Sequence, residues 1–164
     1  MRYGLFLIGL GCSPEENNTP QLQIIEMQFN IHESNLEENF ENNECNTKTP
    51  SISWLGAPAD TKEFAIFVDH AQTGAIHWMA WGILPEVSSL SEDIQPVDYP
   101  PLQGLNSAGK VGYLPTCDPG RYRWRIFALN HPLRLPPTSD PQTLMTNLKK
   151  YTHAIGNFTT EWPQ

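Results

Sequence analysis

The run HWMAWGILP, residues 77–85, decides the fold class of this chain. It is almost wholly apolar and ends at a proline. A second apolar run, FAIFV at residues 64–68, is bounded by polar residues on both sides. Short continuous apolar runs of this kind are typical of strands that are buried on both faces. The two runs therefore predict two central strands of a sheet.

Weaker patterns add further strands around these two. Residues 22–31 alternate imperfectly between apolar and polar, residues 51–55 form a short strand, and residues 158–162 form a last one. Over residues 121–126 arginine alternates with aromatic or aliphatic residues, so the two sets face opposite sides of a strand. Residues 86–120 hold many Pro and Gly and predict a long, turn-rich segment, the kind of loop that often carries function.

The C-terminal part contains the one convincing helix pattern. Ser139 and Gln142 form a capping box, and apolar residues then recur at helical spacing as far as Tyr151. Gly156 can end this helix. The pattern as a whole predicts a mainly β fold, largely antiparallel, with one or two peripheral helices.

Composition limits the classes of function. The chain has 164 residues, which suits one domain, and 39% of them are hydrophobic, which is enough for a sizeable core. Its net charge is −8 and its pI is about 5.0. Nucleic acid would be repelled by most of such a surface, so we expect no nucleic-acid partner.

The N-terminus resembles an export signal. Residues 1–11 have a basic residue followed by a short apolar run, and Cys12 stands where bacterial lipoproteins are cleaved and lipidated. We expect a lipoprotein signal peptide over 1–11, a flexible tether over 12–21 and a folded domain over 22–164. The protein would then be exported and anchored to the membrane of the cell envelope, on its periplasmic side. The alternatives are an ordinary N-terminal segment or a misassigned start codon.

The other two cysteines agree with export. If Cys12 carries lipid, Cys45 and Cys117 remain, and an even number of cysteines in an exported protein favours a disulfide. The alternative is two reduced thiols, as in a cytosolic protein.

The order of the motifs resembles the phosphatidylethanolamine-binding (Raf-kinase-inhibitor-like) family, in its bacterial branch. No single motif is specific, but the ordered set at these spacings is. The matching segments are CNTKTPSISW (45–54), APADTKEF (57–64), HW (77–78), ILP (83–85), NSAGKVGY (106–113), CDPG (117–120), RY (121–122) and AL (128–129). The resemblance covers residues 22–162.

The resemblance implies two antiparallel sheets with a small anion pocket at one edge. Such a pocket accepts phosphate-like groups, including phospholipid head groups, and in some members the same region inhibits kinases or peptidases. Two pocket motifs depart from the family. DHAQ (69–72) stands where the family has Asp-Pro-Asp-Ala-Pro, and Gly120 directly precedes Arg121, where a shortened loop removes the family's histidine.

Six residues are candidates for binding the ligand: Asp69, His70, His77, Gly112, Tyr113 and Tyr122. His77 opens a buried strand, where an imidazole can donate from one nitrogen while a neighbour fixes the other. Tyr122 offers a hydroxyl donor, and the segment ending in Gly112 and Tyr113 can bring backbone N–H groups to a ligand. The alternatives are that His77 is a core histidine whose hydrogen bonds are all made within the protein, that Tyr122 only packs in the core, and that the glycines only form turns.

Asp69 and His70 are ambiguous, because one of them takes the place of the family's first loop aspartate. A histidine there would favour anions below about pH 6.5, where it becomes charged. The alternative is an exposed turn. Arg121, Arg123 and Arg125 form a basic stripe that can steer an anion or pair with acidic partners, or can simply be a solvated face with salt bridges to nearby carboxylates.

We therefore expect a non-catalytic binding protein that recognises a small anionic, phosphate-bearing group such as a phospholipid head group. The alternative is a protein-interaction or inhibitor module with a vestigial pocket. The chain has neither a Gly-x-Ser-x-Gly elbow nor a His-Glu-x-x-His zinc motif, so we expect no enzyme, cofactor or metal site. The least favoured alternatives are a hydrolase with His77 as base and a metal site formed by His70 and His77 and completed by Asp69.

Overall fold

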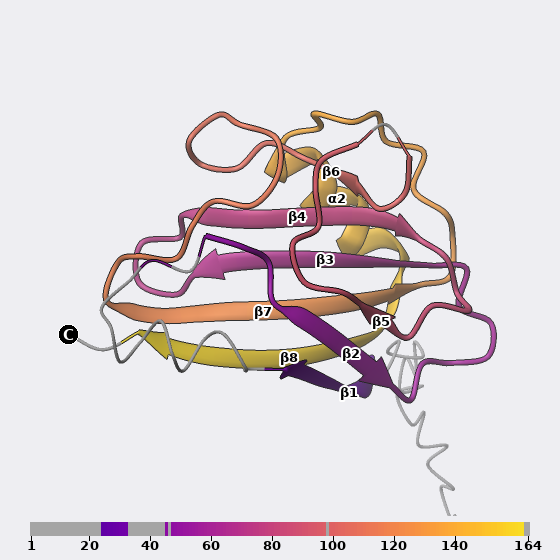
Figure 1. Ribbon diagram of the computed structural model, residues 1–164. Helices are drawn as coiled ribbons and strands as arrows, with labels where there is room; N and C mark the ends of the chain where they lie inside the picture. Colours follow the sequence, from indigo (N-terminus) through magenta and orange to yellow (C-terminus); the bar gives the residue numbers. More distant parts are fainter. Residues whose placement is uncertain (1–23, 33–44, 46, 98, 163–164) are drawn as a thin grey trace, which may run out of the picture.

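A computed structural model describes residues 24–32, 45, 47–97 and 99–162 (Figure 1). The predicted signal peptide, the lipidation site Cys12 and the whole tether lie outside the described residues, so these features remain predictions. The strands are β1 (Ile25–His32), β2 (Ser51–Leu55), β3 (Glu63–His70), β4 (Ile76–Ile83), β5 (Ser89–Leu90), β6 (Leu102–Gln103), β7 (Gly120–Leu129) and β8 (Thr152–Trp162), and the helix is α2 (Pro141–Tyr151).

The described strands follow the spatial order β5-β2-β1-β8-β7-β3-β4-β6. Strand β1 joins two layers, because its first half pairs with β8 and its second half pairs with β2. The mainly β class with a peripheral helix is confirmed. One pairing differs from the antiparallel expectation, since β1 and β8 run parallel over Ile25–Met27.

The two apolar runs that decide the fold class are central strands, as predicted. All eight residues of β3 are buried, and β3 pairs with β4 on one side and with β7 on the other. Alternate side chains of β3 supply two separate cores. Phe64 and Ile66 pack toward β1 and β2, where Trp54 meets Phe64 edge to face at 5.3 Å between ring centroids. Ala65 and Phe67 pack on the opposite side, which α2 covers.

Helix α2 begins one residue later than the capping box predicts. The cap is Asp140, whose Oδ1 accepts the N–H of Thr143 at 2.9 Å. Ser139 does not cap because its hydroxyl donates to the carbonyl of Pro136 at 2.7 Å. No helix in the described part of the chain is long and apolar enough to span a membrane.

Gly156 lies within β8 and does not end the helix, which gives way to the strand at Thr152. A Cβ on Gly156 would lie 2.8 Å from Cβ of Phe29 and 2.9 Å from Cγ2 of Ile126. Glycine therefore allows β8 to approach both β1 and the apolar core closely. The close approach is a tertiary property, which explains why the residue was misread as a helix terminator.

Candidate functional site

Three rings gather at one end of the sheet. Tyr122 lies between His70 and His77, with 4.9 Å between ring centroids in each pair and nearly perpendicular planes. His70 and Tyr122 are direct cross-strand partners on β3 and β7. All three residues are at most 3% exposed. These three of the six predicted residues are therefore brought together.

An irregularity in strand pairing directs His77 toward Tyr122. Val68 pairs with Trp78, but the next residue, Asp69, pairs with Ile76, so His77 is the extra residue on β4. A bulge of this kind changes the direction of one side chain relative to regular alternation. It explains how His77 and its neighbour Trp78 both reach the side of the sheet on which Tyr122 lies.

The hydrogen bonds fix the tautomer of His77. Its Nδ1 lies 3.0 Å from the carbonyl oxygen of Leu114, and its own carbonyl accepts the N–H of Leu114 at 2.7 Å. A carbonyl oxygen only accepts, so Nδ1 carries the proton and Nε2 of the neutral ring is an acceptor. The side-chain hydrogen bond of this ring that the geometry resolves is the one at Nδ1, and the backbone of Pro115 also raises the pKa of the ring.

Burial keeps His77 neutral. Burial lowers the pKa of His77 below its usual value of 6.5, because the charged ring would lose its solvation. The Leu114 carbonyl raises this pKa, the nearby His70 lowers it, and the carboxylate of Asp118 raises it, but burial has the largest effect. At neutral pH the ring therefore offers a lone pair, not a second N–H.

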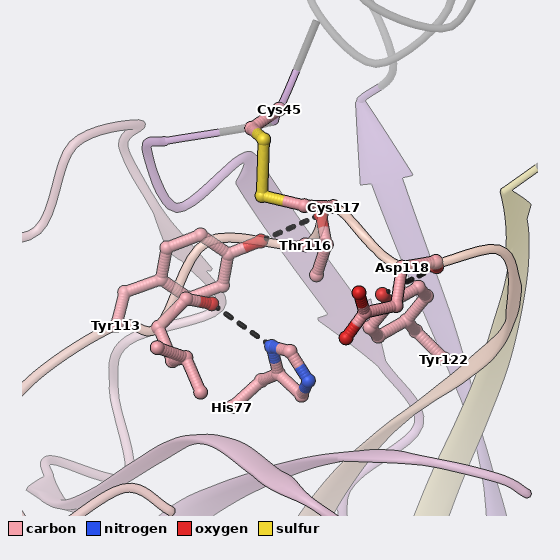
Figure 2. Close-up of a disulfide and its surroundings, with 8 residues drawn as sticks. Cys45, His77, Tyr113, Thr116, Cys117, Asp118 and Tyr122 are labelled. Carbon is pink, nitrogen blue, oxygen red and sulfur yellow. Dashed lines mark hydrogen bonds between the residues drawn. A yellow bond between two sulfur atoms is a disulfide. The ribbon is translucent and has the colours of Figure 1, made fainter. Parts of the chain in front are cut away.

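Asp118 forms the other half of the site. The hydroxyl of Tyr122 donates to the backbone carbonyl of Asp118 at 2.7 Å. Figure 2 shows the Asp118 carboxylate directed toward His77, beside the ring of Tyr122. Burial raises the pKa of Tyr122, so its hydroxyl stays protonated and remains committed to this bond. Asp118 itself is exposed, whereas the rings of His77 and Tyr122 beside it are buried.

The loop that carries Asp118 is held at several points. The predicted disulfide between Cys45 and Cys117 is present (Figure 2). Tyr113 and Thr116 share a hydrogen bond of 3.3 Å between their hydroxyls, and burial strongly raises the pKa of Tyr113. Tyr113 therefore supports the loop from inside, and its hydroxyl is already used.

Gly112 also serves this loop. Its φ of +105° lies in the left-handed region, and an added Cβ would come 3.0 Å from Cγ of Pro96. Its carbonyl accepts from Nδ2 of Asn106 at 3.1 Å and its N–H donates to the carbonyl of Gly104 at 3.3 Å. The backbone N–H of Gly112, which the sequence offers as a ligand donor, is thus occupied.

His70 has the opposite tautomer from His77. Its Nδ1 accepts the N–H groups of Gln72 and Thr73, each at 3.3 Å, so Nε2 carries the proton and donates to the carbonyl of Pro119, also at 3.3 Å. Gly120 makes room for this ring, because a Cβ there would lie 2.6 Å from Nε2. Both nitrogens of His70 are used in holding the turn.

Asp69 lies on the other side of the sheet. It is one residue before His70, so the alternation of β3 directs its carboxylate away from Tyr122. Both of its oxygens are paired there: Oδ1 accepts from Arg125 at 2.6 Å, and Oδ2 accepts from Arg123. The structure does not bring Asp69 together with His77.

Sequence reasoning missed Asp118 and Leu114. The available signal was the carboxylate of Asp118 itself, which lies within the CDPG segment (117–120) directly before the Arg121–Tyr122 strand. Within the described residues, no group of three or more His, Cys, Asp or Glu side chains is placed to hold a metal ion.

Comparison with known proteins agrees with this architecture. The family model described as phosphatidylethanolamine-binding protein matches residues 13–161. A UPF0098 protein of Methanothermobacter thermautotrophicus is 28% identical over 117 residues, which are 66% of this chain and 76% of that protein. A UPF0098 protein of Aquifex aeolicus is 35% identical over 102 residues, which are 54% of this chain and 58% of that protein.

Two solved structures share the fold. A homologue of phosphatidylethanolamine-binding protein from Chlamydia trachomatis matches with a TM-score of 0.72 and 23% identity, covering 85% of this chain and 98% of that one. YbcL of Escherichia coli, described as a new member of the mammalian family, matches with a TM-score of 0.65 and 24% identity, covering 71% and 80% of the two chains.

Proposed function

This chain belongs to the phosphatidylethanolamine-binding protein family, and we propose that it is a non-catalytic binding protein for a head group of the phosphoethanolamine type. The observation that supports this proposal is the pair of acceptors formed by Nε2 of His77 and the Asp118 carboxylate. The sequence alone favours a simple anion. The arrangement of these two groups favours a ligand that brings an amine together with its phosphate.

The amine is the group that fits next to His77. A protonated amine has three N–H donors, which suit a ring lone pair and a carboxylate at the same time. The Asp118 carboxylate would repel an anion at the same point, and the hydroxyl of Tyr122 is already donated to a carbonyl. We therefore place the phosphate away from Asp118.

The absence of a nucleophile beside His77 supports a non-catalytic role. In the described part of the chain, no serine, threonine or cysteine side chain hydrogen-bonds to His77, and Cys117 is held in the disulfide. General-base catalysis needs the reacting hydroxyl or thiol within hydrogen-bond reach of the base.

The test is a titration of the ¹⁵N-labelled protein at pH 7 and constant ionic strength. The three ligands are phosphoethanolamine, ethanolamine and inorganic phosphate. We expect both amines to shift the resonances of His77, Tyr122 and Asp118, and phosphate alone to leave them unchanged. Asp118→Asn removes the charge at nearly constant size and should weaken phosphoethanolamine binding about tenfold. Glu86→Gln, at an exposed carboxylate elsewhere, is the matched control.

Two outcomes would count against the proposal. If phosphate shifts His77 and ethanolamine does not, the site takes an anion, as the sequence analysis expects. If no ligand moves these resonances, the small-molecule function is lost and the protein-interaction module becomes the better account.

The lipid anchor is a separate proposal. A binding domain tethered through lipidated Cys12 would sit close to membrane head groups. The Cys45–Cys117 disulfide supports an oxidising compartment. Mass spectrometry of the protein purified from envelope membranes should find acyl chains on Cys12 and an N-terminus at that residue, and a Cys12→Ala variant should lose both. An unmodified Cys12 would contradict this proposal.

A further inference from the structure

The arginine face lies on the opposite side of the sheet from His77. We use this name for Arg121, Arg123 and Arg125 of β7 together with the β8 residues opposite them. These alternate residues of β7 share a side, and each has a direct partner on β8: Glu161, Thr159 and Asn157 respectively. This side is the one that α2 covers further along the sheet.

The charges on this face are not balanced. Asp69 is buried, and both its oxygens are occupied by Arg123 and Arg125. It therefore neutralises one of three guanidinium groups and also holds two of them in fixed positions. Arg121 is exposed and has no ion pair among the described residues, although Glu161 stands opposite it. The whole chain carries a net charge of −8, which makes this local excess of positive charge notable.

A hollow lies in this face. Its volume is about 310 Å³, and it is lined by Ala71, Arg121, Arg123 and Thr159. The backbone around it is fixed, because Arg121 accepts the N–H of Ala71 at 2.7 Å and donates its own N–H to Oε1 of Gln72 at 3.2 Å. The side chain of Arg123 is 48% exposed, so part of its guanidinium faces solvent while Asp69 holds the rest.

We propose that this hollow is a second binding site, for a tetrahedral oxyanion of the phosphate or sulfate class. Guanidinium groups present several N–H donors in a plane, which matches the spacing of oxygens in such anions. The hydroxyl of Thr159 adds a neutral donor at the same place. This site is independent of the His77 site, because the sheet separates the two.

The charge pattern also predicts which residues set the affinity. Arg121 is the guanidinium that is free of Asp69, so it should contribute most. Glu161 opposes the anion from the next strand, so its removal should strengthen binding. Asp69 is a positioning residue, since it contacts Arg123 and Arg125 and lies beneath the guanidinium groups.

Sulfate is the direct probe, because it stays divalent across the relevant pH range. We would titrate the ¹⁵N-labelled full chain with sulfate at constant ionic strength, with chloride as the balancing anion. The Nε–Hε resonances of Arg121 and Arg123 and the amide of Thr159 should shift and saturate. Arg121→Gln should weaken binding about tenfold, and Glu161→Gln should strengthen it a few-fold. Arg134→Gln, at an exposed arginine elsewhere, should change nothing.

Two further arms identify the source of the anion. Inorganic phosphate represents the free ion, and glycerol 3-phosphate represents a phosphate monoester on a larger molecule. Shifts on the arginine face with either one support the proposal and assign the source. Shifts that do not saturate, or that weaken equally in Arg134→Gln and Arg121→Gln, would show only general screening by salt and would overturn it.

Discussion

At one end of the sheet, the two faces differ in which hydrogen-bonding groups remain free to bind a ligand. On the His77 side, the donors are consumed: Tyr122 donates to Asp118, and Nδ1 of His77 donates to Leu114. What remains are acceptors. On the arginine face both oxygens of the buried Asp69 are paired, and the guanidinium donors of Arg121 and part of Arg123 remain, with Glu161 as the opposing carboxylate. One face suits an amine and the other an oxyanion.

The difference begins at two adjacent residues. Asp69 and His70 follow each other at the end of β3, and the strand directs them to opposite sides. The motif suggests that Asp69 and His70 belong to one candidate site, but the two side chains lie on opposite sides of the sheet. The order of motifs therefore identifies the family, whereas the side of the sheet on which a residue lies decides which residues can bind the same ligand.

The largest expected effect is on the His77 side. The disulfide joins residues separated by 72 positions, and the loop-entropy model gives about 4 kcal/mol for its contribution to the free energy of unfolding. Replacing both cysteines with alanine should lower stability by that order in chemical denaturation. It should also shift the resonances of His77 and Tyr122 but leave those of the arginine face unchanged. Equal shifts on both faces would mean that the two sites are coupled.

Gly120→Ala tests the packing of the same side more locally. Its Cβ would overlap the ring of His70 at 2.6 Å, and φ is +139°, so we expect a loss of about 3 kcal/mol in the free energy of unfolding. Gly109→Ala is the matched control, because φ is +70° and nothing lies within 4 Å. That variant should cost about 1 kcal/mol. If Gly120→Ala and Gly109→Ala lost similar amounts of stability, the contact between residue 120 and His70 would not explain the effect.

Asp69→Asn is the corresponding change on the arginine face. It leaves two guanidinium groups without their buried partner and should cost about 2 kcal/mol of stability, measured by denaturation. Asp60→Asn, at an exposed carboxylate, should cost less than about 0.5 kcal/mol. The resonances of His77 and Tyr122 should not move. If they do, Asp69 belongs to the His77 site after all.

The smallest effect is a dependence on pH. The pKa of His77 is lowered in the folded state, so the unfolded chain takes up a proton first as the pH falls below about 6.5. This residue's contribution to stability is therefore complete above pH 6.5 and is lost as the pH falls, with a slope of at most about 1.4 kcal/mol per pH unit. Comparing the free energy of unfolding of the wild type with that of His77→Asn across this pH range isolates the contribution of His77. If the wild type and the variant lost stability with the same slope, this prediction would be contradicted.

Much of the fold could be predicted from the sequence, because it depends on local patterns. The apolar runs 64–68 and 77–85 identify β3 and β4, and alternation from Arg121 identifies the sides of β7. The site could be predicted only in part. The bulge that turns His77 toward Tyr122 depends on pairing between strands, and the position of Asp118 depends on a loop held by a disulfide. Neither the bulge nor the loop position produces a periodic pattern in the sequence from which it could be predicted.

The central claim is that the two buried histidines are opposite tautomers, so that His77 presents an acceptor. A long-range ¹H–¹⁵N correlation spectrum of the imidazole rings at pH 7 measures this directly. We predict a proton on Nδ1 and a bare Nε2 for His77, and the reverse for His70. A proton on Nε2 of His77 at this pH would contradict the account.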